Sequence, residues 1–243
     1  MELLAVPSTY ASGRETLQRV ATHVLARRRA VLCGKFGLRA TPGGIGTPAC
    51  GPDHEVVRIA GTRLVRELSG GTAHTSSVDL STASLADAAD LVEVSLDAEF
   101  EAGQDTAPLG PTADPLGVDA DAAAVVAGWF AFAWATLDAT LAELGPGADA
   151  SVVQLWPEHF DAGCDVAVSA DQRANLGASP GDGYSAQPYL YVGPWDSVRP
   201  GGPEYWNAPF GAVLAYEDLR AAHEPIATGV SFFVRGVDLL RSR

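Results

Sequence analysis

Apolar residues recur every three or four positions in several stretches of the chain, a spacing typical of helices. The first stretch, 13–28, follows S-G-R-E at 12–15, which has the form of a capping box. A second capping sequence at Ser84 predicts a short helix through about residue 96, and a last helix is expected over 226–240.

A longer helix is predicted after Asp119 or Asp121, either of which can cap it. Its residues are apolar on nearly all faces as far as Leu144, so we expect it at the centre of the fold, with Trp129 and Trp134 in the core. The longest apolar run, 122–137, is shorter than the roughly twenty residues of a membrane span, which favours a buried core helix.

Alternating apolar and polar residues predict strands between these helices. They are expected over 32–39, 55–60, 62–68, 151–156, 164–169, 188–192 and 211–215. Segments rich in Gly and Pro, at 41–48 and 175–183, are predicted as turns or loops, and the acidic stretch 99–118 as a mobile surface loop. Hairpins outnumber βαβ units, so the predicted fold is α+β: a mainly antiparallel sheet packed against the long central apolar helix, with additional N- and C-terminal helices.

The length of 243 residues and the apolar fraction of 47% fit one globular domain. We therefore expect a single domain, 1–243. Two lobes, 1–144 and 150–243, joined by the Gly145–Asp149 linker, are the alternative.

The charge is negative and unevenly distributed. A net charge of −14 repels nucleic acid and anionic membrane surfaces, so neither is expected as a partner. Residues 1–66 hold ten Lys and Arg against four Asp and Glu, whereas 67–150 hold fifteen carboxylates and no Lys or Arg. The three arginines at 27–29 are expected to meet this acidic segment within the fold; a patch for an anionic partner is the alternative.

The cysteines and the N-terminus predict a cytoplasmic protein. Cys33, Cys50 and Cys164 are too few and too widely spaced for a disulfide framework, and none of them form a zinc knuckle. The first residues lack the basic and apolar regions of a secretory signal.

The densest group of chemically capable residues is W-P-E-H-F-D at 156–161. If a strand continues through it, His159 and Asp161 share one face, where an imidazole and a carboxylate can converge on a metal or a proton. In the alternative interpretation, Asp161 caps a turn and His159 bonds to it. No third ligand stands at a diagnostic spacing, so we expect no tightly held metal. The phosphate loop and the dinucleotide fingerprint are both lacking, and no cofactor is predicted.

Aromatic residues concentrate in the C-terminal half, which suggests a small-molecule pocket. Its candidate catalytic residues are His159, Asp161 and Asp182, and its candidate ligand-binding residues are Trp156, Tyr189, Tyr191 and Trp195. Tyr189 and Tyr191, two positions apart, should point to the same side of a strand. The leading hypothesis is a small-molecule binding protein, with catalysis left open. The alternative is a homodimeric assembly protein that uses the aromatic loop Trp195–Trp206.

Five sequence runs carry a family resemblance. They are GKFGLRATPGGIGTP at 34–48, LWPEHFD at 155–161, GASPGD at 177–182, PYLYVGPW at 188–195 and WNAPFGA at 206–212. Together they resemble an uncharacterised, mainly actinobacterial protein family, which implies no particular activity, substrate or cofactor. The resemblance also implies His and acidic residues between the third and fourth runs, where this chain has GYSAQ at 183–187.

Overall fold

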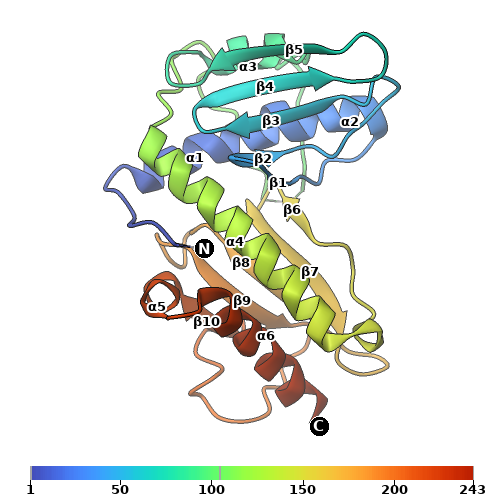
Figure 1. Cartoon of the computed structure of the whole chain (residues 1–243), viewed down its shortest axis with the longest axis vertical. Helices are drawn as coiled ribbons and strands as arrows, with labels where there is room; N and C mark the ends of the chain where they lie inside the picture. Colours follow the sequence, from blue (N-terminus) through green and yellow to red (C-terminus); the bar gives the residue numbers. More distant parts are fainter. Residues whose placement is uncertain (1, 104, 243) are drawn as a thin grey trace. The chain divides into compact units, whose positions relative to one another are not determined.

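The computed structural model describes residues 2–103 and 105–242, and it shows an α+β fold with two antiparallel sheets (Figure 1). The chain divides into two compact units. We call residues 4–131 and 155–160 the N-terminal unit, and residues 1–3, 132–154 and 161–243 the C-terminal unit. The first division falls inside the long helix and not at the Gly145–Asp149 segment, because that segment only turns the chain at the helix end through the 3-10 turn η2 (Pro146–Ala148).

The N-terminal unit begins with a continuous helical stretch. It comprises α1 (Tyr10–Val20), the π-helical segment η1 (Ala21–Ala26) and α2 (Arg27–Cys33). The predicted capping box at 12–15 is wrong, because the N-cap is Thr9 and the Ser12 hydroxyl donates to the Thr9 carbonyl. The helix ends at Gly34, whose φ of 66° is left-handed.

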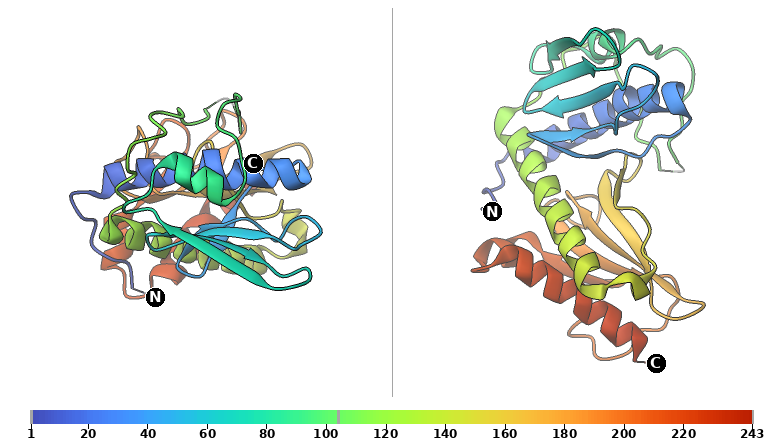
Figure 2. Two further views of the ribbon diagram at one scale, coloured as in Figure 1. Left: turned by 90° about the horizontal axis from the view of Figure 1, so that it is seen from above. Right: turned by 45° about the vertical axis from the view of Figure 1, so that its right-hand side comes forward.

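Five short strands form the sheet of the N-terminal unit in chain order (Figure 2). They are β1 (Arg39–Thr41), β2 (Gly44–Gly46), β3 (Val56–Ala60), β4 (Arg63–Leu68) and β5 (His74–Asp79). The predicted hairpin through Gly61 is confirmed. The predicted strand over 32–39 is wrong, since Leu32 and Cys33 still belong to α2. β5 was not predicted because its side chains lack apolar alternation, as suits an exposed edge strand.

Two helices follow the N-terminal sheet along the chain. Ser84 and Asp87 form the predicted capping box of α3 (Leu85–Leu91). The long helix is α4 (Ala120–Leu144), and Asp119 caps it by accepting the Ala122 N–H at 2.9 Å.

The long helix α4 is the most apolar element of the chain. Trp129 is fully buried as predicted, whereas Trp134 is only half-buried. By length and composition alone α4 could cross a membrane, a test that the core helix of a globular protein also passes. In its most apolar window, 56% is buried inside the protein, as is typical of such a core helix.

The second sheet has the order β10-β9-β8-β7-β6 and belongs to the C-terminal unit, except that Leu155 and Trp156 of β6 are assigned to the N-terminal unit. Its strands are β6 (Gln154–Trp156), β7 (Asp161–Ala167), β8 (Arg173–Ser179), β9 (Tyr189–Pro194) and β10 (Ala212–Ala215), followed by α5 (Tyr216–Ala221) and α6 (Pro225–Arg241). The prediction of a loop over 175–183 is wrong for residues 175–179, which belong to the inner strand β8. The glycine and alanine residues of β8 give no clear apolar alternation in the sequence. Their small size nevertheless lets neighbouring side chains, such as Tyr191 over Gly177, pack closely against the strand.

The two faces of the C-terminal sheet differ in chemistry. Small and aliphatic side chains of alternate positions, such as Leu176, Leu190 and Val192, are fully buried. A Cβ added to Gly229 of α6 would lie 2.9 Å from Leu190 and 2.7 Å from Thr136 of α4, so this face packs against both helices. The other face carries polar and aromatic residues, which are described below as the candidate site.

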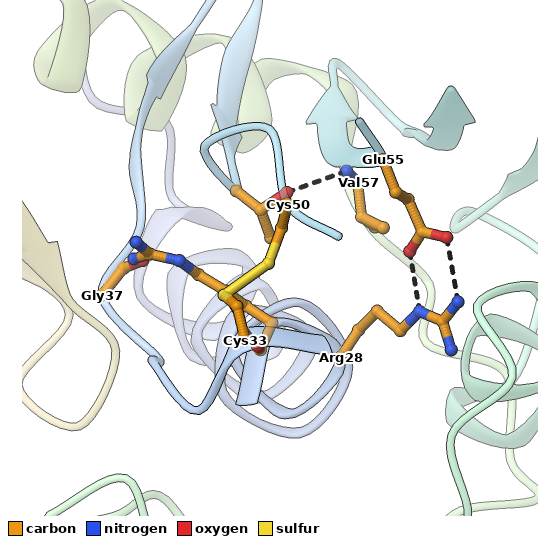
Figure 3. Close-up of a disulfide and its surroundings, with 8 residues drawn as sticks. Arg28, Cys33, Gly37, Cys50, Glu55 and Val57 are labelled. Atoms are coloured by element: carbon orange, nitrogen blue, oxygen red, sulfur yellow. Dashed lines mark hydrogen bonds and ion pairs between the residues drawn. A yellow bond between two sulfur atoms is a disulfide. The ribbon is translucent and has the colours of Figure 1, made fainter. Parts of the chain in front are cut away.

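Arg27, Arg28 and Arg29 all bind within the N-terminal unit, but only some of their contacts reach the acidic segment 67–150 as predicted: Arg27 bonds to Ala98, and Arg28 lies 3.4 Å from Glu93. Arg28 forms a bidentate ion pair with Glu55, at 2.7 and 2.9 Å (Figure 3). Arg27 donates to the Ala98 carbonyl at 2.6 Å, and Arg29 donates to the Gly37 carbonyl.

Cys33 and Cys50 form a disulfide between the end of α2 and the chain before β3 (Figure 3). The sequence spacing predicted no disulfide framework, because nothing in it shows that the helix end and this turn lie together. Disulfides persist mainly in oxidising compartments, so this bond does not support the predicted cytoplasmic location.

Candidate binding site

The 156–161 motif is divided between two structural roles. The chain forms a turn over 157–160, and Asp161 begins β7 in the C-terminal unit. The hypothesis that one strand continues from His159 to Asp161 is therefore wrong. Phe160, which lies between these two residues, has a left-handed φ of 54°. His159 and Trp156 belong to the N-terminal unit, and the other five candidates belong to the C-terminal unit.

The turn at 157–160 is bound to the helices of the N-terminal unit by hydrogen bonds and a ring contact. Gln18 donates to the Glu158 carbonyl at 3.1 Å, and Thr22 donates to the Pro157 carbonyl at 3.0 Å. The Phe160 ring packs edge-on against Phe130, with centroids 5.4 Å apart. The side chain of His159 is about half exposed, with Nδ1 3.7 Å from the Asp105 carboxylate. These contacts indicate that residues 157–160 serve mainly to pack the turn against the N-terminal unit.

Tyr191 and Asp161 meet on the polar face of the C-terminal sheet. Tyr191 of β9 lies opposite Gly177 of β8, and its ring occupies the space where a side chain at 177 would be, 2.2 Å from an ideal Cβ. The ring thereby crosses β8, and its hydroxyl donates to Oδ2 of Asp161 on β7. Gly177 is required because any larger residue would displace the tyrosine.

Asp182 organises the loop between β8 and β9. Its Oδ1 accepts the backbone N–H groups of Tyr184 at 2.8 Å and Ser185 at 3.2 Å. Its Oδ2 accepts the hydroxyl of Tyr189 at 2.5 Å and that of Ser179 at 3.4 Å. These four donors are neutral, so they hold the carboxylate in place without cancelling its charge.

Tyr189 and Tyr191 lie side by side, with ring centroids 6.2 Å apart, as their two-residue spacing predicted. Phe210 lies 6.5 Å from Tyr189 and 6.3 Å from Tyr191, and the Tyr184 ring lies 5.0 Å from Phe210. Tyr184 and Phe210 are 47% and 38% exposed, so the aromatic group has a face open to ligands. We call Asp161, Ser179, Asp182, Tyr184, Tyr189, Tyr191 and Phe210 the tyrosine–aspartate cluster.

Tyr189 and Tyr191 remain protonated near neutral pH. Burial, followed by the neighbouring Asp182 carboxylate, raises the pKa of Tyr189 above its usual value. Burial and the Asp161 carboxylate raise the pKa of Tyr191 well above the usual value. Each phenol is therefore a hydrogen-bond donor to a carboxylate and not a phenolate base.

Other candidate residues have separate roles. Trp195 is 61% exposed, and its indole N–H donates to Asn175 at 2.8 Å. Within residues 2–103 and 105–242, no group of three His, Cys, Asp or Glu side chains is placed to hold a metal ion. Four residues of the cluster and its support were not predicted as site residues: Ser179, Tyr184, Phe210 and Gly177. Only the tertiary structure shows that they converge, through strand register for Gly177 and ring contacts for Tyr184 and Phe210.

The chain matches no protein-family model, no curated protein and no solved structure. The family resemblance of the five sequence runs therefore stays a prediction.

Proposed function

We propose that the protein binds a small organic amine at the tyrosine–aspartate cluster of its C-terminal unit. The observation that carries this proposal is the position of Asp182, whose carboxylate accepts the hydroxyl of Tyr189. The Tyr189 ring in turn contacts the partly exposed rings of Tyr184 and Phe210. Aromatic faces attract cations, and a nearby carboxylate adds to that attraction. The net charge of −14 also draws cations toward the protein.

The proposal concerns binding and includes no chemical step. It is confined to the C-terminal unit, so His159 and Trp156 are not part of it. Asp161 and Tyr191 form the base of the proposed site. The ring of Tyr191 is held in place there because it packs directly against Gly177.

The test compares choline with 3,3-dimethylbutanol, which has the same shape and no charge. Titrations followed by NMR should give shifts of the Tyr184 and Phe210 rings with choline, and binding of the alcohol at least about fivefold weaker. Asp182→Asn, which can still accept the two loop N–H groups, should weaken choline by a similar factor. Asp171→Asn, which changes an exposed aspartate of the same unit, should leave the affinity unchanged. Equal binding of the two probes would refute the proposal.

A second candidate function is homodimerisation through the loop Trp195–Trp206. The specific observation in its favour is that this loop exposes apolar side chains, 61% of Trp195 and 52% of Val198. Two hydrogen bonds hold the loop: Trp206 donates to the Pro200 carbonyl within it at 2.7 Å, and Tyr205 donates to the Phe232 carbonyl of α6 at 2.7 Å. A rigid loop with exposed aromatic surface is typical of interfaces.

Sedimentation equilibrium decides this second proposal. A dimer at micromolar concentration that Trp195→Ala dissociates, and that Val152→Ala leaves intact, would support it. Val152 is a matched control because it is 83% exposed and lies outside the loop. A monomer at these concentrations contradicts it.

A further inference from the structure

The polar face of the C-terminal sheet has a second aromatic feature, at the end of β9, which lies between β8 and β10 (Figure 1). Tyr191, Gly193 and Trp195 follow one another at two-residue intervals, so they lie on the same face of the strand. A strand rises about 3.3 Å per residue, which places the Cα atoms of Tyr191 and Trp195 about 13 Å apart. Gly193 lies between the two aromatic residues and has no side chain.

The position of Gly193 has room for a side chain. An ideal Cβ there would lie 3.8 Å from Cβ of Asn175 and 4.0 Å from Cδ2 of Tyr191, both ordinary van der Waals distances. Gly177 differs, because the ring of Tyr191 occupies the place of its side chain. Close packing therefore does not require a glycine at 193. The glycine instead leaves half-buried backbone open between two aromatic residues.

The Trp195 indole is both exposed and held in place. The residue is 61% exposed. Its indole N–H donates to Oδ1 of Asn175 at 2.8 Å, and its backbone N–H donates to the Arg173 carbonyl at 3.1 Å. A ring that is already restrained loses little conformational entropy when a ligand stacks on it. Trp195 thus offers a preorganised flat surface.

Asn175 offers hydrogen-bond donors beside this surface. It is an exposed residue of β8, directly opposite Gly193. An indole N–H only donates, so the side-chain oxygen of Asn175 faces the ring. Within residues 2–103 and 105–242, the NH₂ group of Asn175 makes no hydrogen bond. A ligand next to the indole can therefore accept hydrogen bonds from this NH₂ group.

The charges nearest to Asn175 are already paired. Asp165 lies opposite Asn175 on β7, and its carboxylate accepts the Nε–H of Arg173. The same guanidinium donates to the Asp149 carboxylate at 3.0 Å. The Asp182 carboxylate differs, because all of its donors are neutral. This pairing favours a neutral ligand over a cation or an anion.

An exposed aromatic face, free N–H donors and paired charges together suit a sugar ring. The face of an aromatic ring is electron-rich, so it attracts the weakly positive C–H groups on one face of a pyranose. The hydroxyl oxygens at the edge of the pyranose accept hydrogen bonds from an amide. A purely aromatic ligand could stack in the same place, but it would leave the donors of Asn175 unpaired.

We propose that Tyr191, Gly193, Trp195 and Asn175, which we call the Trp195 platform, bind a neutral pyranose. The sugar ring stacks on the indole beside Gly193, and its hydroxyl oxygens accept from the Asn175 amide. This inference goes beyond the proposed amine site, with which the platform shares only Tyr191. The amine titration is followed at Tyr184 and Phe210 and the sugar titration at Trp195, so either proposal can fail without the other.

The test compares methyl β-D-glucopyranoside with D-glucitol, which has similar hydroxyl groups on an open chain and no ring face. Both are titrated into the full-length protein while the Trp195 indole N–H is observed by ¹H–¹⁵N NMR. The resonance is assigned by its loss in Trp195→Phe. The glucoside should shift it and bind at least about tenfold more tightly than the open chain, which must be ordered on binding.

Two results would overturn the proposal. One is an equal effect of the glucoside and D-glucitol on the Trp195 resonance. The other is an unchanged resonance at tens of millimolar of the glucoside, of the corresponding galactoside and of the corresponding N-acetylglucosaminide.

A variant pair locates the site without changing Trp195. Gly193→Val should fill the platform and abolish binding of the glucoside. Its φ is not left-handed, the Cβ has room and valine favours strands, so the variant should melt no lower than the wild type. Gly183→Val makes the same change at an exposed glycine with no atom within 4 Å of its ideal Cβ, and it should bind the glucoside as the wild type does.

Gly193 lies outside the loop Trp195–Trp206, so this variant tests sugar binding without altering the proposed dimer surface. Glucoside binding that survives Gly193→Val in the folded protein would contradict the assignment.

Discussion

The two units each bury a carboxylate, but they hold it with different donors. In the N-terminal unit, Glu55 binds the guanidinium groups of Arg28 and Arg66, and Arg66 continues to Glu93 at 2.8 Å. In the C-terminal unit, Asp161 accepts the hydroxyl of Tyr191. Glu55 thus shares its charge with two cations, whereas the phenol of Tyr191 is neutral.

This difference separates a structural network from a site suited to ligands. The Arg–Glu network links Arg28 of α2 and Arg66 of β4 to Glu93, which lies just after α3. Opposite charges within the network compensate one another. In the tyrosine–aspartate cluster, neutral donors surround Asp182, and the ring of one of them, Tyr189, contacts the exposed rings of Tyr184 and Phe210. A network of the first kind stabilises the fold, and a cluster of the second kind leaves charge available to a ligand.

The largest expected effect comes from breaking the Arg–Glu network at its centre. Glu55→Gln would leave Arg28 and Arg66 buried without their full counter-charge, so the N-terminal unit should lose about 3 to 5 kcal/mol of unfolding free energy. Chemical denaturation followed by circular dichroism measures the loss. Glu67→Gln, which weakens the more exposed pair with Arg58, should cost less than about 1 kcal/mol. Similar costs for both variants would show that the buried network stabilises the fold no more than the exposed pair does.

The disulfide should stabilise the same unit by a comparable amount. Cys50 also pairs through its backbone with Glu55, so the disulfide restrains the segment just before β3 that carries the buried carboxylate. Closing a loop of 17 residues predicts about 3 kcal/mol from chain entropy. Denaturation with and without a reducing agent measures this contribution. The double variant Cys33→Ser, Cys50→Ser should be insensitive to reductant, and sensitivity that persists there would exclude this bond as the cause.

Tyr191→Phe tests the phenol–carboxylate contact. It removes the hydroxyl that donates to buried Asp161 and should cost about 1 to 3 kcal/mol. Tyr184→Phe, at a ring that is 47% exposed, should cost much less. Thermal unfolding of the two variants in parallel gives the comparison. An unchanged melting curve for Tyr191→Phe would mean that the contact contributes nothing to stability.

The smallest expected effect is a pH dependence that arises from His23. Its folded pKa lies below 6.5, so the unfolded chain binds the proton first as the pH falls, and the folded state loses stability below 6.5. The loss cannot exceed about 1.4 kcal/mol per pH unit for one proton. His23→Gln, whose amide can still donate to the Ala107 carbonyl that His23 bonds, should flatten the stability curve between pH 6.5 and about 5.

The exposed histidine His223 provides the control for this prediction. Its side chain is 96% exposed, so His223→Gln should retain the wild-type curve in the same pH range. Carboxylates do not confuse the result, because lowered pKa values such as that of Glu55 act below 4.5. Equal curves for wild type and His23→Gln would remove His23 as the source.

The candidate site was only partly predictable. Asp161, Asp182, Tyr189 and Tyr191 were identified from their chemistry and spacing, and the structure brings them to one face of one sheet. Phe210 lies nineteen positions after Tyr191, in a segment with no pattern of its own. His159 was grouped with Asp161 on the assumption of a continuous strand, which the turn at 157–160 breaks.

The sequence by itself determined the α+β class, the apolar helix α4, the capping box at Ser84 and the hairpin at Gly61. These features depend on neighbours within a few residues, where hydrophobic period and local hydrogen bonds decide the conformation. Tertiary structure alone decided that Gly177 makes room for Tyr191, that Cys33 meets Cys50, and that His23 lies beneath a loop some eighty residues away. Such contacts follow from packing between distant segments, and no local pattern encodes which segments will become neighbours.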